Sequence, residues 1–262
     1  MKGWLWNGAA FQPAEGMPLS DRGARYGMAL FESMAVWNGR VESWPEHQQR
    51  LKIACAERDF FADDRAFAFV RETLESARAD GFARIYVTAG DGGPTAPIES
   101  PRIFLMLESR EREREDCWDL GFHDDVYHPP FGGLKTANYW FHCDALAQAR
   151  ARKFHEALLF NDHAELVSAC CANVFLVRDE KVSTPPRGSG CRQGVVREWV
   201  MQQTKVTERR LRQEDVTLAD EIFITNSWLG IMPIATLEGR PLGPRRIGAR
   251  LAGAFAESSL RL

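Results

Sequence analysis

Residues 132–139 read Gly-Gly-Leu-Lys-Thr-Ala-Asn-Tyr, which places one lysine between a double-glycine turn and an alanine-rich segment. That segment predicts a helix over about 137–152. A lysine at the end of a turn is often a solvated loop residue, so the local pattern leaves two interpretations open. In the second, Lys135 lies in a partly dry pocket, where desolvation favours the neutral amine that can form a Schiff base.

The composition limits the class of protein to which this stretch belongs. The chain has 262 residues and a formal net charge of −3, and 45% of its residues are hydrophobic. Such a length predicts one large domain or two small ones, and the apolar content excludes intrinsic disorder. The near-neutral charge argues against nucleic acid as a partner. No apolar run approaches the ~18 residues that a membrane-spanning helix needs, so no membrane partner is expected.

The cysteines and histidines are scattered along the chain. The 6 cysteines form no C-x-x-C pair, and the 6 histidines form no H-E-x-x-H or comparable cluster. We therefore expect reduced thiols and no metal site. The first eight residues contain no long apolar segment, which predicts no signal peptide and a cytoplasmic protein.

Turn and helix patterns predict a hairpin and a helix in the first part of the chain. Asn38-Gly39 predicts a hairpin between strands near 30–36 and 40–44, because both residues accept positive φ. A helical pattern covers 64–79, and Gly81 is expected to end that helix.

A charged run marks the predicted domain boundary. Residues 108–116 alternate between acidic and basic side chains, which is typical of a solvated linker. We therefore predict two α/β domains, 1–112 and 118–262. In the second, strands are expected between the helix near 137–152 and a further helix that Gly194 opens.

Ten short segments, each weak alone, match one enzyme family in order and at sensible spacing. They are residues 19–23, 26–32, 38–39, 47–51, 135–139, 156–158, 173–175, 184–186, 194–197 and 220–227. The chain resembles the fold-type IV pyridoxal-phosphate enzymes, or class IV aminotransferases. That family includes branched-chain aminotransferases, D-amino acid aminotransferases and 4-amino-4-deoxychorismate lyases.

The resemblance implies an α/β, two-domain fold of the D-amino acid aminotransferase type. A small N-terminal α/β domain would precede a larger C-terminal α/β pseudo-barrel domain, with pyridoxal 5′-phosphate in the cleft between them. It also implies a homodimer and a small-molecule amino substrate.

The resemblance further implies roles for individual residues. Lys135 would form the Schiff base with the cofactor and later move a proton. Arg50 would bind the cofactor phosphate, because a guanidinium suits a dianion. Phe31 stands where family members often carry an aromatic residue near the substrate. The other cofactor-binding positions are a helix start and a strand end, namely Gly194, Val195, Val196, Asn226 and Ser227.

One position departs from the family pattern. The family usually has a glutamate five residues before the asparagine of its Asn-x-Phe segment, where it keeps the pyridine nitrogen protonated. Ser168 stands there in this chain, and Glu165 lies three residues upstream, on the opposite face if the strand is regular. A serine can hydrogen-bond only to a neutral ring nitrogen, which makes the ring a weaker electron sink. Ser168 therefore favours elimination over transamination, and it also permits a non-catalytic homologue.

The subfamily signals favour a lyase. Residues 170–173 and 225–233 resemble 4-amino-4-deoxychorismate lyase, although Glu32-Ser33 replaces the lyase's threonine-containing segment. The Arg-x-His carboxylate trap of D-amino acid aminotransferases is absent from 93–97, so no residue is assigned to a substrate carboxylate. We expect elimination of pyruvate, with class IV transamination as the alternative.

Overall fold

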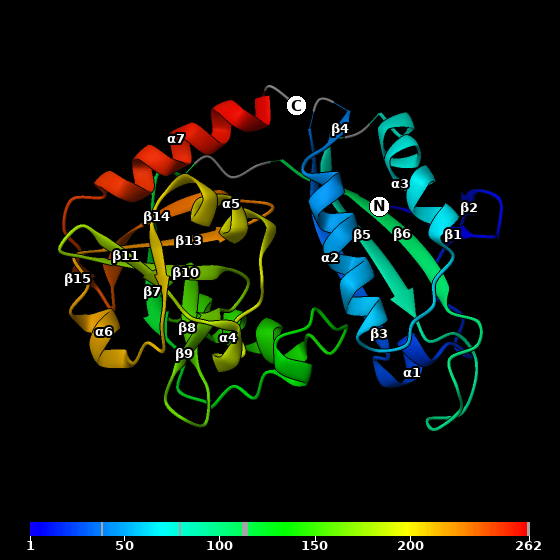
Figure 1. The fold of residues 1–262 in the computed structure, drawn as a ribbon, viewed down its shortest axis with the longest axis horizontal. Helices are drawn as coiled ribbons and strands as arrows, with labels where there is room; N and C mark the ends of the chain where they lie inside the picture. The colour runs from blue at the N-terminus through cyan, green and yellow to red at the C-terminus, as the bar shows by residue number, and fades with distance from the viewer. Residues whose placement is uncertain (38, 79, 112–114, 261–262) are drawn as a thin grey trace. The chain divides into compact units, whose positions relative to one another are not determined.

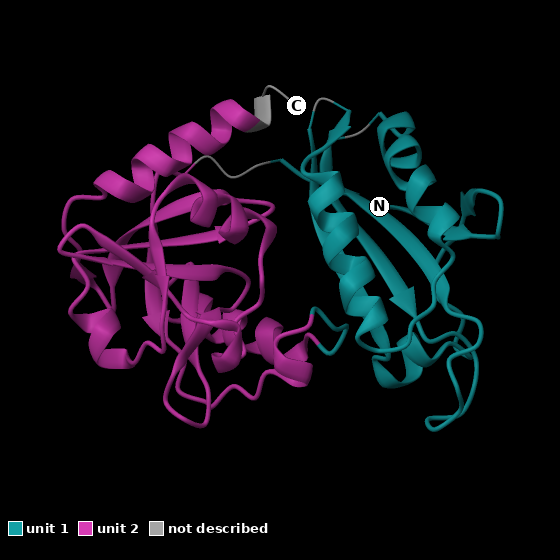
Figure 2. Cartoon of the chain, viewed as in Figure 1, with its two compact units in different colours: residues 1–112, 135–138 teal, residues 113–134, 139–262 magenta. Residues whose placement is uncertain are grey.

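The computed structural model describes residues 1–37, 39–78, 80–111 and 115–260, so the predicted turn residue Asn38 and part of the predicted linker lie outside it. The chain forms two compact units (Figures 1 and 2). The first unit contains residues 1–112 and 135–138, and the second contains 113–134 and 139–262. The predicted second domain, 118–262, includes residues 135–138, whereas the structure groups these four residues with the first unit.

The first unit is an antiparallel sheet with the strand order β2-β1-β6-β5-β3-β4 in its described part. Its strands are β1 (Lys2–Trp6), β2 (Phe11–Pro13), β3 (Ala29–Trp37), β4 (Arg40–Val41), β5 (Gly81–Thr88) and β6 (Arg102–Ser109). Its helices are α1 (Arg22–Tyr26), α2 (Trp44–Ala56) and α3 (Asp64–Ser76). Helix α2 packs on β3, which is buried along almost its whole length.

Two local predictions in this unit have different outcomes. The hairpin is confirmed, because β3 and β4 pair with Trp37 opposite Arg40 and Gly39 has a φ of 67°. Its second strand is shorter than the predicted 40–44, since β4 ends at Val41 and α2 begins at Trp44. The assignment of Gly81 as a helix stop is wrong. Helix α3 ends at Ser76, and Gly81 is the first residue of β5, where a Cβ would overlap the backbone oxygen of Glu108. The close approach of two strands therefore requires this glycine.

The second unit is a larger mixed sheet with the strand order β12-β11-β10-β13-β14-β7-β8-β9, and β15 pairs with β14. Its strands are β7 (Trp118–Phe122), β8 (Glu156–Phe160), β9 (Leu166–Ala169), β10 (Asn173–Arg178), β11 (Lys181–Thr184), β12 (Val206–Glu208), β13 (Glu221–Asn226), β14 (Gly230–Leu237) and β15 (Arg240–Pro241). Its helices are η1 (Pro130–Gly132), α4 (Trp140–Ala151), η2 (Arg187–Ser189), α5 (Val195–Gln203), α6 (Gln213–Thr217) and α7 (Arg246–Leu260).

The central strands of this sheet are buried on both faces. On β10, Val174 and Leu176 join one core cluster, while Phe175 and Val177 join another. This alternation follows from the two-residue period of a strand. Helices α5 and α7 contribute apolar side chains to the second cluster. The start of α5 is thus packed onto β10 and β13, which positions the site described below.

No helix in the described ranges is both long and apolar enough to cross a membrane.

Candidate active site

Lys135 is held against β3 by main-chain hydrogen bonds. Its carbonyl accepts from the N–H of Phe31 at 2.9 Å, and the N–H of Ala137 donates to Ala29 at 2.9 Å. Thr136 forms a bridge with Leu30, so the segment continues the first sheet beside β3. The half-buried Lys135 side chain places Nζ 4.3 Å from the centroid of the Phe31 ring. The predicted amine and the predicted aromatic residue are therefore neighbours.

A buried carboxylate organises the other predicted residue of this unit, Arg50. Glu32, which is 2% exposed, accepts hydrogen bonds from Arg50 Nε at 2.7 Å and from Arg50 Nη2. His47 Nδ1 lies 2.8 Å from the same carboxylate. Two donors on the guanidinium give a bidentate pair, which fixes its plane as well as its position.

The charges of this cluster follow from its partners. Burial alone would raise the pKa of Glu32, but Arg50 and His47 together hold that pKa well below its usual range. Burial, with the nearby charges of Arg50 and Lys135, lowers the pKa of His47 despite the opposing effect of Glu32. At neutral pH the cluster therefore contains a carboxylate, a guanidinium and a neutral imidazole whose Nδ1–H donates to Glu32.

In the second unit, the predicted helix start is located beside the asparagine of the Asn-x-Phe segment. Gly194 is the N-cap of α5, and Val195 and Val196 form its first turn. A Cβ on Gly194 would overlap Asn173 Oδ1, so only glycine allows this approach. The first N–H groups of a helix have no intrahelical acceptor and carry a partial positive charge, which suits an anion.

Asn173 also connects the helix start to the predicted strand end. It pairs in register with Thr225, directly before Asn226 and Ser227. Thr225 Oγ1 is buried and has no partner among the described residues. The Asn226 side chain donates to the carbonyl of Cys171 at 3.1 Å and accepts from the amides of residues 228 and 229, so it shapes the turn. The two predicted phosphate segments are thus brought together.

Ser168 lies on β9 opposite Leu159 and is 9% exposed. Its hydroxyl has no hydrogen-bond partner within the described part of the chain. Glu165 is committed elsewhere, because it accepts from Ser189 Oγ at 2.6 Å and lies 3.0 Å from Arg210 Nη1.

A second buried carboxyl in this unit was not identified from the sequence. Glu156 is the first residue of β8 and is 2% exposed. Both of its oxygens lie 3.2 Å from the N–H of Cys171. Burial raises its pKa to about 7, against the opposing effect of that hydrogen bond.

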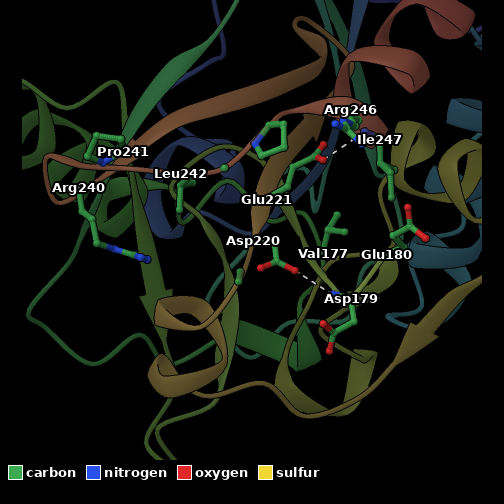
Figure 3. A pocket seen from close by; sticks show the side chains of 13 residues that line it. Val177, Asp179, Glu180, Asp220, Glu221, Arg240, Pro241, Leu242, Arg246 and Ile247 are labelled. Carbon is green, nitrogen blue, oxygen red and sulfur yellow. Dashed lines mark hydrogen bonds between the residues drawn. The ribbon is translucent and has the colours of Figure 1, made fainter.

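A pocket elsewhere in the second unit has a different composition from the predicted site. It encloses about 420 Å³ and is lined by residues of β10, β13, β15 and the start of α7, none of them a predicted site residue (Figure 3). Two of its acidic side chains, those of Glu221 and Asp220, accept hydrogen bonds from backbone amides. Glu221 accepts from the amides of Ile247 and Gly248 at the start of α7, and Asp220 accepts from the amide of Asp179 at 2.8 Å.

The predicted residues therefore form two sets. Phe31, Arg50 and Lys135 gather in the first unit, and the helix start, the strand end and Ser168 lie in the second. Glu32, His47 and Asn173 had no individual role predicted from the sequence. A detectable signal existed for Glu32, because a charged residue in an otherwise apolar buried strand needs a partner.

Comparisons with known proteins show what the chain is similar to. The family model described as amino-transferase class IV matches residues 29–237. The chain is 26% identical over 245 residues to an aminodeoxychorismate lyase of Vibrio harveyi, covering 85% of this chain and 88% of that one. It is 22% identical over 256 residues to a D-alanine aminotransferase of Bacillus licheniformis, covering 91% and 89%. The crystal structure of 4-amino-4-deoxychorismate lyase from Pseudomonas aeruginosa matches with a TM-score of 0.85 at 25% identity, covering 97% and 98%.

Proposed function

Because the chain belongs to the class IV aminotransferase family of pyridoxal 5′-phosphate enzymes, we propose that it is a lyase similar to aminodeoxychorismate lyase, which eliminates pyruvate from an amino substrate. The observation that carries this choice is Ser168. Its buried hydroxyl lies where the family usually has a glutamate, and Glu165 is held by Ser189 and Arg210.

The residues of the chain fit the cofactor. A primary amine reacts with an aldehyde, and a guanidinium and a helix start both favour a phosphate dianion. Thr225 Oγ1, buried without a partner among the described residues, is a donor that a phosphate oxygen would satisfy. We assign to the cofactor Arg50, Lys135, Ser168, Gly194, Val195, Val196, Asn226 and Ser227, and to the substrate Phe31.

The proposed catalytic work falls to Lys135. Bound pyridoxal phosphate withdraws electrons from the substrate carbon that carries the amino group. The Lys135 amine would act as the general base that removes the proton from that carbon. Phe31, 4.3 Å from Nζ, limits the positions that the amine can occupy.

Ser168 decides between the two chemistries. Its hydroxyl can donate to a neutral pyridine nitrogen, but it cannot keep a proton there as a carboxylate does. A neutral pyridine ring then withdraws electrons from the substrate carbon more weakly than a protonated ring would. Elimination tolerates this because the electrons leave with the departing group, whereas transamination must hold them on the cofactor.

The alternatives are distinct and testable. A class IV aminotransferase is supported by the likeness to the D-alanine aminotransferase of Bacillus licheniformis. A non-catalytic homologue would follow if Ser168 prevented productive binding. We also propose that the chain acts as a homodimer. A cytoplasmic location is supported by its six cysteines, all of them free thiols.

Product analysis tests the proposal. The holoenzyme incubated with aminodeoxychorismate should release pyruvate and 4-aminobenzoate in equal amounts. Conversion of the cofactor to its pyridoxamine form by amino acids, without pyruvate release from aminodeoxychorismate, would instead make it an aminotransferase. Neither activity in a protein that binds the cofactor would refute both enzymatic assignments.

A further inference from the structure

The connection between β9 and β10 in the second unit (Figure 1) touches both segments that we assign to the cofactor phosphate, the start of α5 and the end of β13. It consists of residues 170–172 and leads directly into Asn173, whose Oδ1 approaches Gly194 at the start of α5. The amide of Ala169 donates to the carbonyl of Ala172 at 2.8 Å, so the connection is a tight loop. A shift of this loop would therefore disturb the phosphate segments.

Side chains from two other strands hold Cys171 in this loop. Its N–H lies 3.2 Å from both carboxyl oxygens of Glu156, the first residue of β8. Its carbonyl accepts a hydrogen bond at 3.1 Å from Nδ2 of Asn226, the last residue of β13. Glu156 and Asn226 thus bind the main chain of the same residue, and a displacement of Cys171 would move the oxygen that Asn226 binds.

Asn226 carries this constraint into residues 226–229, here called the phosphate turn. Its Oδ1 accepts from the N–H of Trp228 at 2.9 Å and from that of Leu229 at 2.7 Å. A side-chain amide that donates through its nitrogen and accepts through its oxygen is fixed in position and plane. The turn contains Ser227, which we assign to the phosphate. A continuous series of hydrogen bonds therefore connects Glu156 to the phosphate turn.

The burial of Glu156 indicates that its acceptor oxygens matter. The side chain is 2% exposed, and its partners include two neutral donors, the amide of Cys171 and the thiol of Cys170. A carboxyl in such a place costs desolvation energy that an apolar side chain of the same size would not. Since a protonated carboxyl still has an oxygen that accepts, the contact with Cys171 is available in both protonation states.

A second buried carboxyl offers a comparison in the same unit. Glu221, the first residue of β13, is 3% exposed and accepts from the amides of Ile247 and Gly248 at the start of α7. It lies at the opposite end of β13 from Asn226, roughly 17 Å away along the strand. Removing this carboxyl leaves the contacts of Cys171 in place.

We propose that Glu156 is a positioning residue for the cofactor phosphate. It acts through the main chain of Cys171, which holds Asn226 and so fixes the phosphate turn. The inference rests on the proposed function and deepens it, because it adds a residue that supports the phosphate site from behind. A turn that is already ordered loses less entropy when its ligand binds, so Glu156 raises the affinity for the phosphate rather than for the pyridine ring.

Two ligands that differ only by the phosphate test this role. Pyridoxal phosphate and pyridoxal are each titrated into the full-length protein freed of cofactor, and visible absorbance reports binding. The ratio of the two Kd values measures the preference for the phosphate. Glu156→Met has a similar length but no oxygen, and it should lower this preference about 3- to 10-fold, the range for one hydrogen bond. Glu156→Gln keeps an acceptor oxygen and should recover most of the preference.

Glu221→Met is the matched control, because it removes an equally buried carboxyl that accepts from main-chain amides elsewhere. It should leave the preference for the phosphate unchanged. The same loss of preference in Glu221→Met as in Glu156→Met would show a general effect of destabilisation and would overturn the role of Glu156. An equal loss of affinity for both ligands in Glu156→Met would also overturn it.

Hydrogen exchange of the cofactor-free proteins tests the same contacts without a ligand. The amides of Trp228 and Leu229 should exchange faster in Glu156→Met than in the wild type, in Glu156→Gln or in Glu221→Met. Unchanged exchange at these two amides would refute the link between Glu156 and the phosphate turn. If exchange rises as expected but the wild type binds pyridoxal phosphate no better than pyridoxal, the proposed phosphate site fails and the positioning of the turn by Glu156 stands.

Discussion

Glu156 gives the protein a pH-dependent stability that one substitution should remove. Its pKa is raised to about 7 because the carboxyl is buried on β8, and the ordinary value is 4.5. A raised pKa means that its contribution to stability is fully present below about pH 4.5 and is lost as the pH rises through about 7. The difference between the two values corresponds to about 3 kcal/mol.

Glu156→Gln keeps the shape of the side chain and cannot ionise. Between about pH 5 and about pH 8, the free energy of unfolding of the wild type should fall relative to that of the variant by about 2–3 kcal/mol. Urea unfolding of both holoproteins at the two pH values measures this difference. Glu257→Gln, an exposed carboxyl on α7, is the control and should follow the wild type. Parallel pH profiles for Glu156→Gln and the wild type would refute the assignment of a raised pKa to this carboxyl.

Three further substitutions test the remaining parts of the site. Glu32→Gln should lower the free energy of unfolding by about 1–3 kcal/mol and weaken cofactor binding, because it removes the carboxylate that fixes the half-buried guanidinium of Arg50. Unchanged cofactor affinity would contradict this. Gly194→Ala should weaken cofactor binding, since its Cβ would displace Asn173, whereas Gly188→Ala, which meets no atom within 4 Å, should not. Ser168→Glu should raise the rate of any transamination and shift the absorbance spectrum of the cofactor. Ser168→Ala should lower the rate of elimination by at most about tenfold. If Ser168→Glu leaves the spectrum unchanged, residue 168 does not reach the pyridine ring.

The family segments made much of the architecture predictable. Each segment is short, but their order along the chain is specific. The helix expected after Gly194 begins at Val195, and Gly194 is its N-cap. The two-unit α/β organisation was expected from the family resemblance, and the charged run at 108–116 gave the position of the boundary. Boundaries were less accurate, as Gly81 shows, because a glycine after a helix does not reveal which backbone it approaches.

The contacts within the site could not be predicted, because they join residues that are far apart in the sequence and have no fixed spacing. The grouping of Lys135 with the first unit results from main-chain pairing with Phe31, more than a hundred residues earlier. The Glu32 pair with Arg50 joins a strand to a helix and has no fixed spacing in sequence.

The central claim is that Lys135 carries the cofactor, and trapping the bond tests it most directly. Borohydride reduces the link between a lysine amine and the cofactor aldehyde to a stable one, and peptide mapping then locates the label. We predict a yellow protein with one labelled lysine, Lys135, and a Lys135→Ala variant that takes up no label. A label on another lysine, or no cofactor uptake by the wild-type protein, would contradict the account.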